Sequence, residues 1–298
     1  MNLVKLLAIF FIALPLNFNF ANASEQGNIL STIKPIYSLI ANITNNKNIK
    51  IIVNDNSIPH DYIIKPSDIK KANLAGSIIY IDSNYETFLS NIFKNSNIYQ
   101  KSYSIIDIAN IELIKLTTNN HDNGHNHGGY DYHIWLDVKL MIKFVKNFTE
   151  ILINQYPQNK LLYSKNSKDL INRLEILDKK VAKKLAKISN IEILFFHDAY
   201  RYYAKSYNLK KINYISKSPK EILSAKDIID IKKDIIDKDI KCILSENNFT
   251  NKIINQLAKK YQISVKIIDP LGFGKKPDKE MYFDLINELT NQISNCHI

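Results

Sequence analysis

Cysteine, tryptophan, methionine and glycine are scarce in this chain of 298 residues, which contains two, one, three and seven of them respectively. Two cysteines are too few for a metal site built from several thiolates, so the softer metal ions lack the ligands they prefer. The sequence also lacks a His-Glu-x-x-His segment, the helical zinc motif of many metalloproteases. These absences weigh against a thiolate cluster and against a common type of zinc hydrolase.

No apolar run in the chain reaches the roughly 20 residues that a membrane-spanning helix requires. The longest, Leu6–Leu16, follows Lys5 and precedes the small residues Ala21 and Ala23. This order is typical of a secretory signal peptide, and we expect residues 1–23 to be removed after Ala23. The alternatives are a buried N-terminal helix and a membrane anchor. No cysteine lies near the cleavage site, so we expect a freely soluble periplasmic protein without a lipid anchor.

Charge gives little functional information. The formal net charge is +11, but the lysines are scattered and alternate with aspartate and glutamate, which is typical of solvated helix faces. We therefore expect no nucleic-acid partner.

Short β-branched runs that alternate with helix-compatible stretches predict an α/β fold with parallel sheets. The expected strands are Ile49–Val53, Ser77–Ile81, Ile191–Phe196, Lys211–Ile215, Ile240–Leu244 and Ser264–Ile268. The expected helices are Pro66–Ala75, Asp137–Gln155, Ala225–Lys238 and Lys252–Tyr261.

A segment without glycine or proline, 158–189, separates the two strand-rich halves. Its apolar residues recur every three or four positions, which indicates one long helix with a single buried face. They are Leu170, Leu174, Leu177, Val181, Leu185 and Ile188. We therefore predict an N-terminal lobe (24–157), a rigid linker helix (158–189) and a C-terminal lobe (190–298); a helical hairpin is the alternative for the middle segment.

Three of the seven histidines, His121, His125 and His127, lie in one glycine-rich polar segment. We interpret residues 118–128 as a surface loop with weak, auxiliary metal affinity. An ordinary loop without a metal role is the alternative.

Three other histidines are candidates for a tighter site. His60 lies beyond an expected strand, His197 directly follows one, and His133 precedes an expected helix, while Asp269 ends another strand. Side chains at the carboxyl ends of parallel strands face a shared crevice. Three imidazoles with a carboxylate or water as fourth ligand suit Zn²⁺. Taken singly, each histidine could equally be an ordinary polar residue at the end of a strand or helix.

Four segments carry a resemblance to a known family: PHDYIIKPSDIKKANLA, DYHIWLDV, FFHDAYRYY and IIDPLG. In order and separation they resemble the metal-site segments of periplasmic zinc-uptake proteins, which belong to the helix-linked solute-binding family of ABC transporters. The resemblance implies two (β/α) lobes joined by a long helix, with metal held between them by His60, His133 and His197. It also places Asp269 at the family's terminal carboxylate.

The two cysteines, Cys242 and Cys296, match the paired cysteines of the zinc branch. Export already favours a disulfide between them, the alternative being two unrelated thiols. The chain departs from some zinc members at Pro59, where they carry a glutamate.

The resulting prediction is a monomeric binding protein, not an enzyme, that captures periplasmic Zn²⁺ and delivers it to an ABC-type permease in the inner membrane. Alternatives are a manganese- or iron-binding member of the same family, a zinc-dependent hydrolase, and an adhesin of the same fold. Manganese-type relatives resemble this family but carry a carboxylate at the position of His197.

Overall fold

The computed structural model describes residues 27–53, 57–116, 129–216, 222–246 and 252–297. The expected signal peptide, 1–23, and the His-rich loop, 118–128, lie outside these residues and remain predictions. In the described part of the chain, no helix combines the length and the apolar content that crossing a membrane requires.

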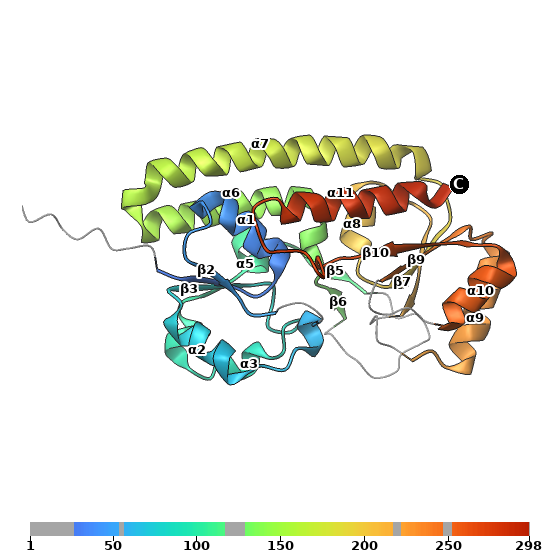
Figure 1. The fold of residues 1–298 in the computed structure, drawn as a ribbon, viewed down its shortest axis with the longest axis horizontal. Coiled ribbons are helices and arrows are strands. Elements are labelled where there is room, and N and C mark those ends of the chain that lie inside the picture. Colours follow the sequence, from blue (N-terminus) through green and yellow to red (C-terminus); the bar gives the residue numbers. More distant parts are fainter. Residues whose placement is uncertain (1–26, 54–56, 117–128, 217–221, 247–251, 298) are drawn as a thin grey trace, which may run out of the picture.

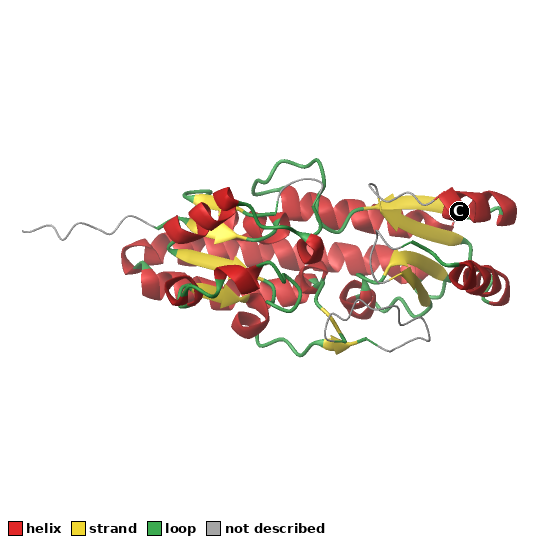
Figure 2. Cartoon of the chain, turned by 90° about the horizontal axis from the view of Figure 1, so that it is seen from below, coloured by secondary structure: helices red, strands yellow, loops and turns green. Residues whose placement is uncertain are grey.

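Two four-stranded parallel sheets follow one another along the long axis of the molecule (Figures 1 and 2). The first sheet has the order β2-β1-β3-β4, formed by Ile49–Ile51, Ile29–Ser31, Ser77–Tyr80 and Ser102–Ser104. The second has the order β10-β9-β7-β8, formed by Ser264–Ile268, Cys242–Glu246, Ile193–His197 and Ile212–Ser216. The predicted α/β class with one parallel sheet in each half is confirmed.

Helices cover the faces of both sheets. In the first half they are α1 (Lys34–Thr44), α2 (Pro66–Leu74), α3 (Leu89–Ile92), α4 (Ser96–Tyr99), α5 (Ile105–Ala109) and α6 (Val138–Gln155). In the second half they are α8 (Arg201–Ser206), α9 (Ala225–Asp237), α10 (Lys252–Tyr261) and α11 (Met281–Ser294). A short antiparallel pair, β5 (Ile114–Lys115) and β6 (Tyr130–Asp131), flanks the segment that contains the His-rich loop.

Helix α7 (Lys160–Leu185) is the long helix that the sequence predicts, and it runs along both halves of the molecule (Figure 1). A single 3₁₀ turn, Pro157–Asn159, joins it to α6, and a second one, Ala186–Ile188, continues it. All six apolar residues of its predicted face are buried. At about 1.5 Å per residue the helix is about 39 Å long, so it can contact both sheets. The lobe boundaries at 157 and 190 remain a prediction.

One hydrophobic core continues through both halves. It includes Ile79 of the first sheet, Leu174 of α7, Phe195 of the second sheet and Tyr282 of α11. A smaller hydrophobic cluster covers the outer face of each of the two sheets. The halves therefore share packing and are not held together by α7 alone.

The two cysteines form a disulfide, as the resemblance implies. Cys242 begins β9 and Cys296 follows α11, and their sulfurs are bonded. Both are almost fully buried. The bond therefore fixes the C-terminal helix to the second sheet.

Candidate metal centre

His60 lies in a 3₁₀ turn, Pro59–Asp61, on the segment that follows β2. Its Nδ1 is 2.9 Å from Oδ1 of Asp61, and its ring packs edge-on against Tyr85 with the centroids 5.7 Å apart. Burial lowers the pKa of His60 and outweighs the opposing hydrogen bond and charge of Asp61. The ring therefore stays neutral, the form that binds a metal ion.

His133 directly precedes a 3₁₀ turn, Ile134–Leu136, and follows strand β6. Asp131 accepts two hydrogen bonds from it at the same oxygen: one from the backbone N–H at 2.9 Å and one involving Nδ1 at 2.8 Å. The ring packs against both Tyr85 and Trp135, with centroid separations of 5.3 and 5.1 Å. Its side chain makes no capping hydrogen bond to that turn.

His197 is the last residue of β7. It therefore lies inside the strand, whereas the sequence predicts that it directly follows the strand. Its Nδ1 is 2.9 Å from Oε1 of Glu246, the last residue of the neighbouring strand β9, and both side chains are only 3% exposed. Tyr200 donates a hydrogen bond to the same carboxylate oxygen at 3.0 Å. The Nε2 atom is buried and makes no hydrogen bond with any described residue.

The pKa of His197 reflects opposing causes. Burial lowers it, but the charge of Glu246 and the hydrogen bond to it together outweigh burial, so the pKa is raised. A proton therefore competes for this ring at a higher pH than for an ordinary histidine. The pKa of His60, by contrast, is lowered.

The three rings share one design: a carboxylate lies 2.8–2.9 Å from each Nδ1, so Nε2 is the nitrogen that can face a ligand. In His133 a ligand at Nε2 would replace the long hydrogen-bond contact of 3.5 Å with the hydroxyl of Tyr85. Metal-binding histidines commonly use such a carboxylate to fix the ring and raise its basicity. Asp61, Asp131 and Glu246 fill this role for His60, His133 and His197. These three roles were not predicted from the sequence, although Asp131 lies two residues before His133 and Glu246 ends a parallel strand.

The rings converge from both halves of the molecule. The centroids of His133 and His197 are 5.1 Å apart, and those of His60 and His197 are 6.4 Å apart. With Zn–N bonds of about 2.0–2.1 Å and tetrahedral angles, two coordinated imidazoles have centroids about 5 Å apart. His133 and His197 already stand at that separation. His60 is about 1 Å too distant, and as the side chains stand, no three His, Cys, Asp or Glu residues of the described chain are close enough to hold one ion.

Asp269, the fourth predicted ligand, is engaged with its own turn. Its Oδ1 accepts hydrogen bonds from the backbone N–H groups of Leu271 and Gly272, both at 2.8 Å, and Oδ2 accepts one from Phe273. Burial raises the pKa of Asp269 despite these three donors. Oδ1 already accepts two hydrogen bonds, but Oδ2 accepts only one and retains a second lone pair, so the carboxylate can still accept a further partner there. Its role as a ligand remains a prediction.

His121, His125 and His127 lie outside the described residues, so their auxiliary role is a prediction only. Trp135 and Tyr200 are fully buried beside the three histidines: Trp135 packs against His133, and Tyr200 bonds the carboxylate that holds His197.

Two parallel α/β halves bridged by one long helix, with histidines from both halves converging, define a solute-binding protein of the helix-linked type. The model of the family "Zinc-uptake complex component A periplasmic" matches residues 29–296, and the chain belongs to this family. Its members are solute-binding transport proteins and not enzymes, which excludes the hydrolase alternative.

Individual relatives agree with this assignment. The high-affinity zinc uptake system protein ZnuA of Yersinia pestis is 24% identical over 299 residues, which covers 94% of this chain and 92% of the relative. A crystal structure of ZnuA superposes with a TM-score of 0.76 at 19% identity and covers 91% of this chain and 99% of that one. The solute-binding protein FpvC of Pseudomonas aeruginosa, in complex with Mn²⁺, superposes with a TM-score of 0.78 at 18% identity, over 91% and 98%. Both structures show the fold alone.

Proposed function

We propose that this protein captures Zn²⁺ in the periplasm and presents it to the permease of an ABC transporter as a monomer without a lipid anchor. The observation that carries the proposal is the convergence of three imidazoles, each oriented by its own carboxylate, two of which are buried. Such a nitrogen-rich site favours Zn²⁺ over Mn²⁺, because the intrinsic affinity order already places zinc far above manganese.

The spacing of the rings predicts a local rearrangement on binding. His133 and His197 need almost no adjustment, whereas the ring of His60 must approach His197 by about 1 Å to complete a tetrahedral site. His60 lies on a short 3₁₀ turn rather than on a regular helix or strand. Such a turn can shift by this amount without disturbing a sheet.

Manganese remains the specific competitor, because a protein of the same fold is known in complex with Mn²⁺. Position 197 discriminates between the two metals. Manganese-type relatives resemble this family but carry a carboxylate there, and carboxylates suit Mn²⁺ whereas imidazoles suit Zn²⁺.

The test is competitive calorimetry with both metals on the wild-type protein and on His197→Glu. We expect the wild-type protein to bind one Zn²⁺ per chain and to prefer it strongly over Mn²⁺, and His197→Glu to reduce that preference. Protein purified without chelator or affinity tag gives the stoichiometry independently. Equal wild-type affinities for the two metals would contradict the zinc assignment but not metal capture.

A further inference from the structure

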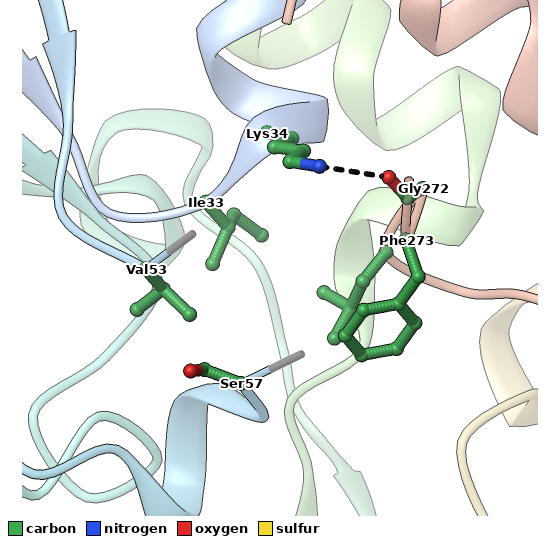
Figure 3. A pocket seen from close by; sticks show the side chains of 7 residues that line it. Ile33, Lys34, Val53, Ser57, Gly272 and Phe273 are labelled. Carbon is green, nitrogen blue, oxygen red and sulfur yellow. Dashed lines mark hydrogen bonds between the residues drawn. The ribbon is translucent and has the colours of Figure 1, made fainter. Parts of the chain in front are cut away.

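Lys34, the first residue of α1, reaches from the N-terminal half into the C-terminal half. Its side chain is buried, and its ammonium donates hydrogen bonds to the backbone carbonyls of Gly272 at 3.0 Å and Lys275 at 2.8 Å. Both acceptors lie on the segment between β10 and α11. This segment begins at Asp269, directly after β10, which is an edge strand of the second sheet. Figure 3 shows the bond from Lys34 to Gly272.

A second donor from the N-terminal half holds the same segment. The indole Nε1 of Trp135 donates to the carbonyl of Pro270 at 2.7 Å, and the indole ring packs against His133 with the centroids 5.1 Å apart. The segment 270–275 is therefore bound at both ends by side chains of the other half. One of these side chains touches a candidate metal ligand.

The contact around Lys34 is closely packed. The space between Ile33, Val53 and Ser57 on one side and Gly272 and Phe273 on the other has a volume of about 10 Å³, room for one water molecule at most (Figure 3). Gly272 has a φ of +76°, and a Cβ there would come within 2.0 Å of Met281. Glycine therefore lets the segment turn so that its carbonyl faces Lys34.

The burial of Lys34 determines how much its bonds contribute. A buried ammonium is costly unless hydrogen bonds replace its hydration, and a bond from a charged donor is stronger than a neutral one. The ammonium of Lys279 bonds Asn45 across the same boundary, but in an exposed position. Exposed contacts contribute much less because water competes for both partners.

We propose that Lys34 is a positioning residue that sets the spacing of the two halves and so holds His133 at the distance from His197 at which both can bind one ion. This inference rests on the proposed function. In the described part of the chain the ammonium of Lys34 bonds the carbonyls of Gly272 and Lys275. It acts through the segment 270–275, which Trp135 connects to His133. Loss of Lys34 lets the halves separate slightly, which lowers the pre-organisation of the site and accelerates metal release.

The test compares Lys34→Met with Trp135→Phe and with Lys279→Met as the matched control. Zinc release is followed by stopped flow against a chelator, and the visible spectrum of the Co²⁺-loaded protein reports the ligand geometry. We expect Lys34→Met to release zinc faster by up to about tenfold, the lower end of the effect of removing a partner bonded directly to a ligand, because Lys34 acts through other residues. Trp135→Phe should accelerate release in the same direction and alter the Co²⁺ spectrum, while Lys279→Met changes neither.

The outcomes separate this inference from the proposed function. If the wild-type protein binds no Zn²⁺ at the three histidines, the proposed function fails. If it binds but Lys34→Met releases zinc at the wild-type rate, only the positioning role is wrong. A Lys34→Met protein that melts earlier yet keeps the wild-type release rate and Co²⁺ spectrum also contradicts the positioning role, because Lys34 then stabilises the fold alone.

Discussion

Glu246→Gln probes the carboxylate that holds His197. Glutamine keeps the size of the side chain and an oxygen that can accept from Nδ1, but it removes the negative charge. Both partners are 3% exposed and 2.9 Å apart, so the charge is screened little by water. Loss of such an outer-shell carboxylate weakens metal binding by about 10–100-fold, or about 1.4–2.7 kcal/mol. We expect this loss at pH 8, the alkaline end of the titration, where a proton competes least for the ring.

Glu246→Gln weakens zinc binding at pH 8, but it also makes zinc binding less sensitive to a fall in pH. In the wild-type protein the charge and hydrogen bond of Glu246 outweigh burial and raise the pKa of His197. At any pH below that pKa, zinc must displace a proton from His197. As the pH is lowered, the zinc affinity of the wild-type protein therefore starts to fall at a pH above 6.5, the ordinary pKa of histidine. Glu246→Gln leaves burial as the larger cause, so the pKa of His197 falls and the proton competes only at lower pH. The variant therefore binds more weakly at pH 8 but loses less affinity between pH 8 and pH 6.

The assay is a competitive titration with a fluorescent zinc chelator at several pH values from 8 to 5.5, corrected for protonation of the chelator. Glu192→Gln is the matched control, because Glu192 precedes β7 and pairs with Lys211 at the opposite end of the strand from His197. The reasoning is refuted if Glu246→Gln equals the wild type at pH 8, or if the variant loses zinc at a higher pH than the wild type.

Three further outcomes are expected. Asp269→Asn should weaken zinc binding less than His197→Ala does, measured by the same titration; an unchanged Asp269→Asn removes that residue from the site. The Cys242–Cys296 bond closes a loop with a sequence separation of 54, and its reduction should cost about 4 kcal/mol of stability through the regained loop entropy of the unfolded chain. The melting temperature should fall by about 10 °C, without a change in zinc stoichiometry. Calorimetry with and without reductant checks this, and an unchanged melting temperature contradicts it. Deletion of 118–128 should abolish weak extra binding and spare the tight site, because a loop that must become ordered binds less tightly; loss of tight binding would place the loop in the primary site.

Much of the fold is readable from local pattern. The β-branched runs predict six strands to within two residues at each end, and β10 and α10 have the predicted bounds. The apolar stripe of α7 and its lack of glycine and proline predict one long helix. Strands β7 and β9 are displaced toward the C-terminus because Ile191 and Ile240 form the turns that close the preceding helices, through backbone bonds to Ile188 and Ile235. Apolar residues in such turns are indistinguishable from strand residues by composition.

Other elements depend on tertiary contacts and were not predicted. Strands β1 and β4 are three residues long, too short to show a periodicity. The pairing of His197 with Glu246 joins residues 49 positions apart on adjacent strands, and it follows from the strand order β9-β7. The bonds of Lys34 to the segment before α11 span 238 and 241 positions. Sequence spacing identified the histidines, whereas only the folded chain identifies what orients them.

The most direct test of the account is anomalous diffraction at the zinc edge from crystals of the protein purified without chelator or affinity tag. We expect one zinc peak per chain, about 2.0–2.1 Å from Nε2 of His60, His133 and His197, with the ring of His60 about 1 Å closer to His197 than its present centroid separation of 6.4 Å. A tightly held ion bound by other residues, or one that leaves His197 uncoordinated, would contradict the assignment of the site.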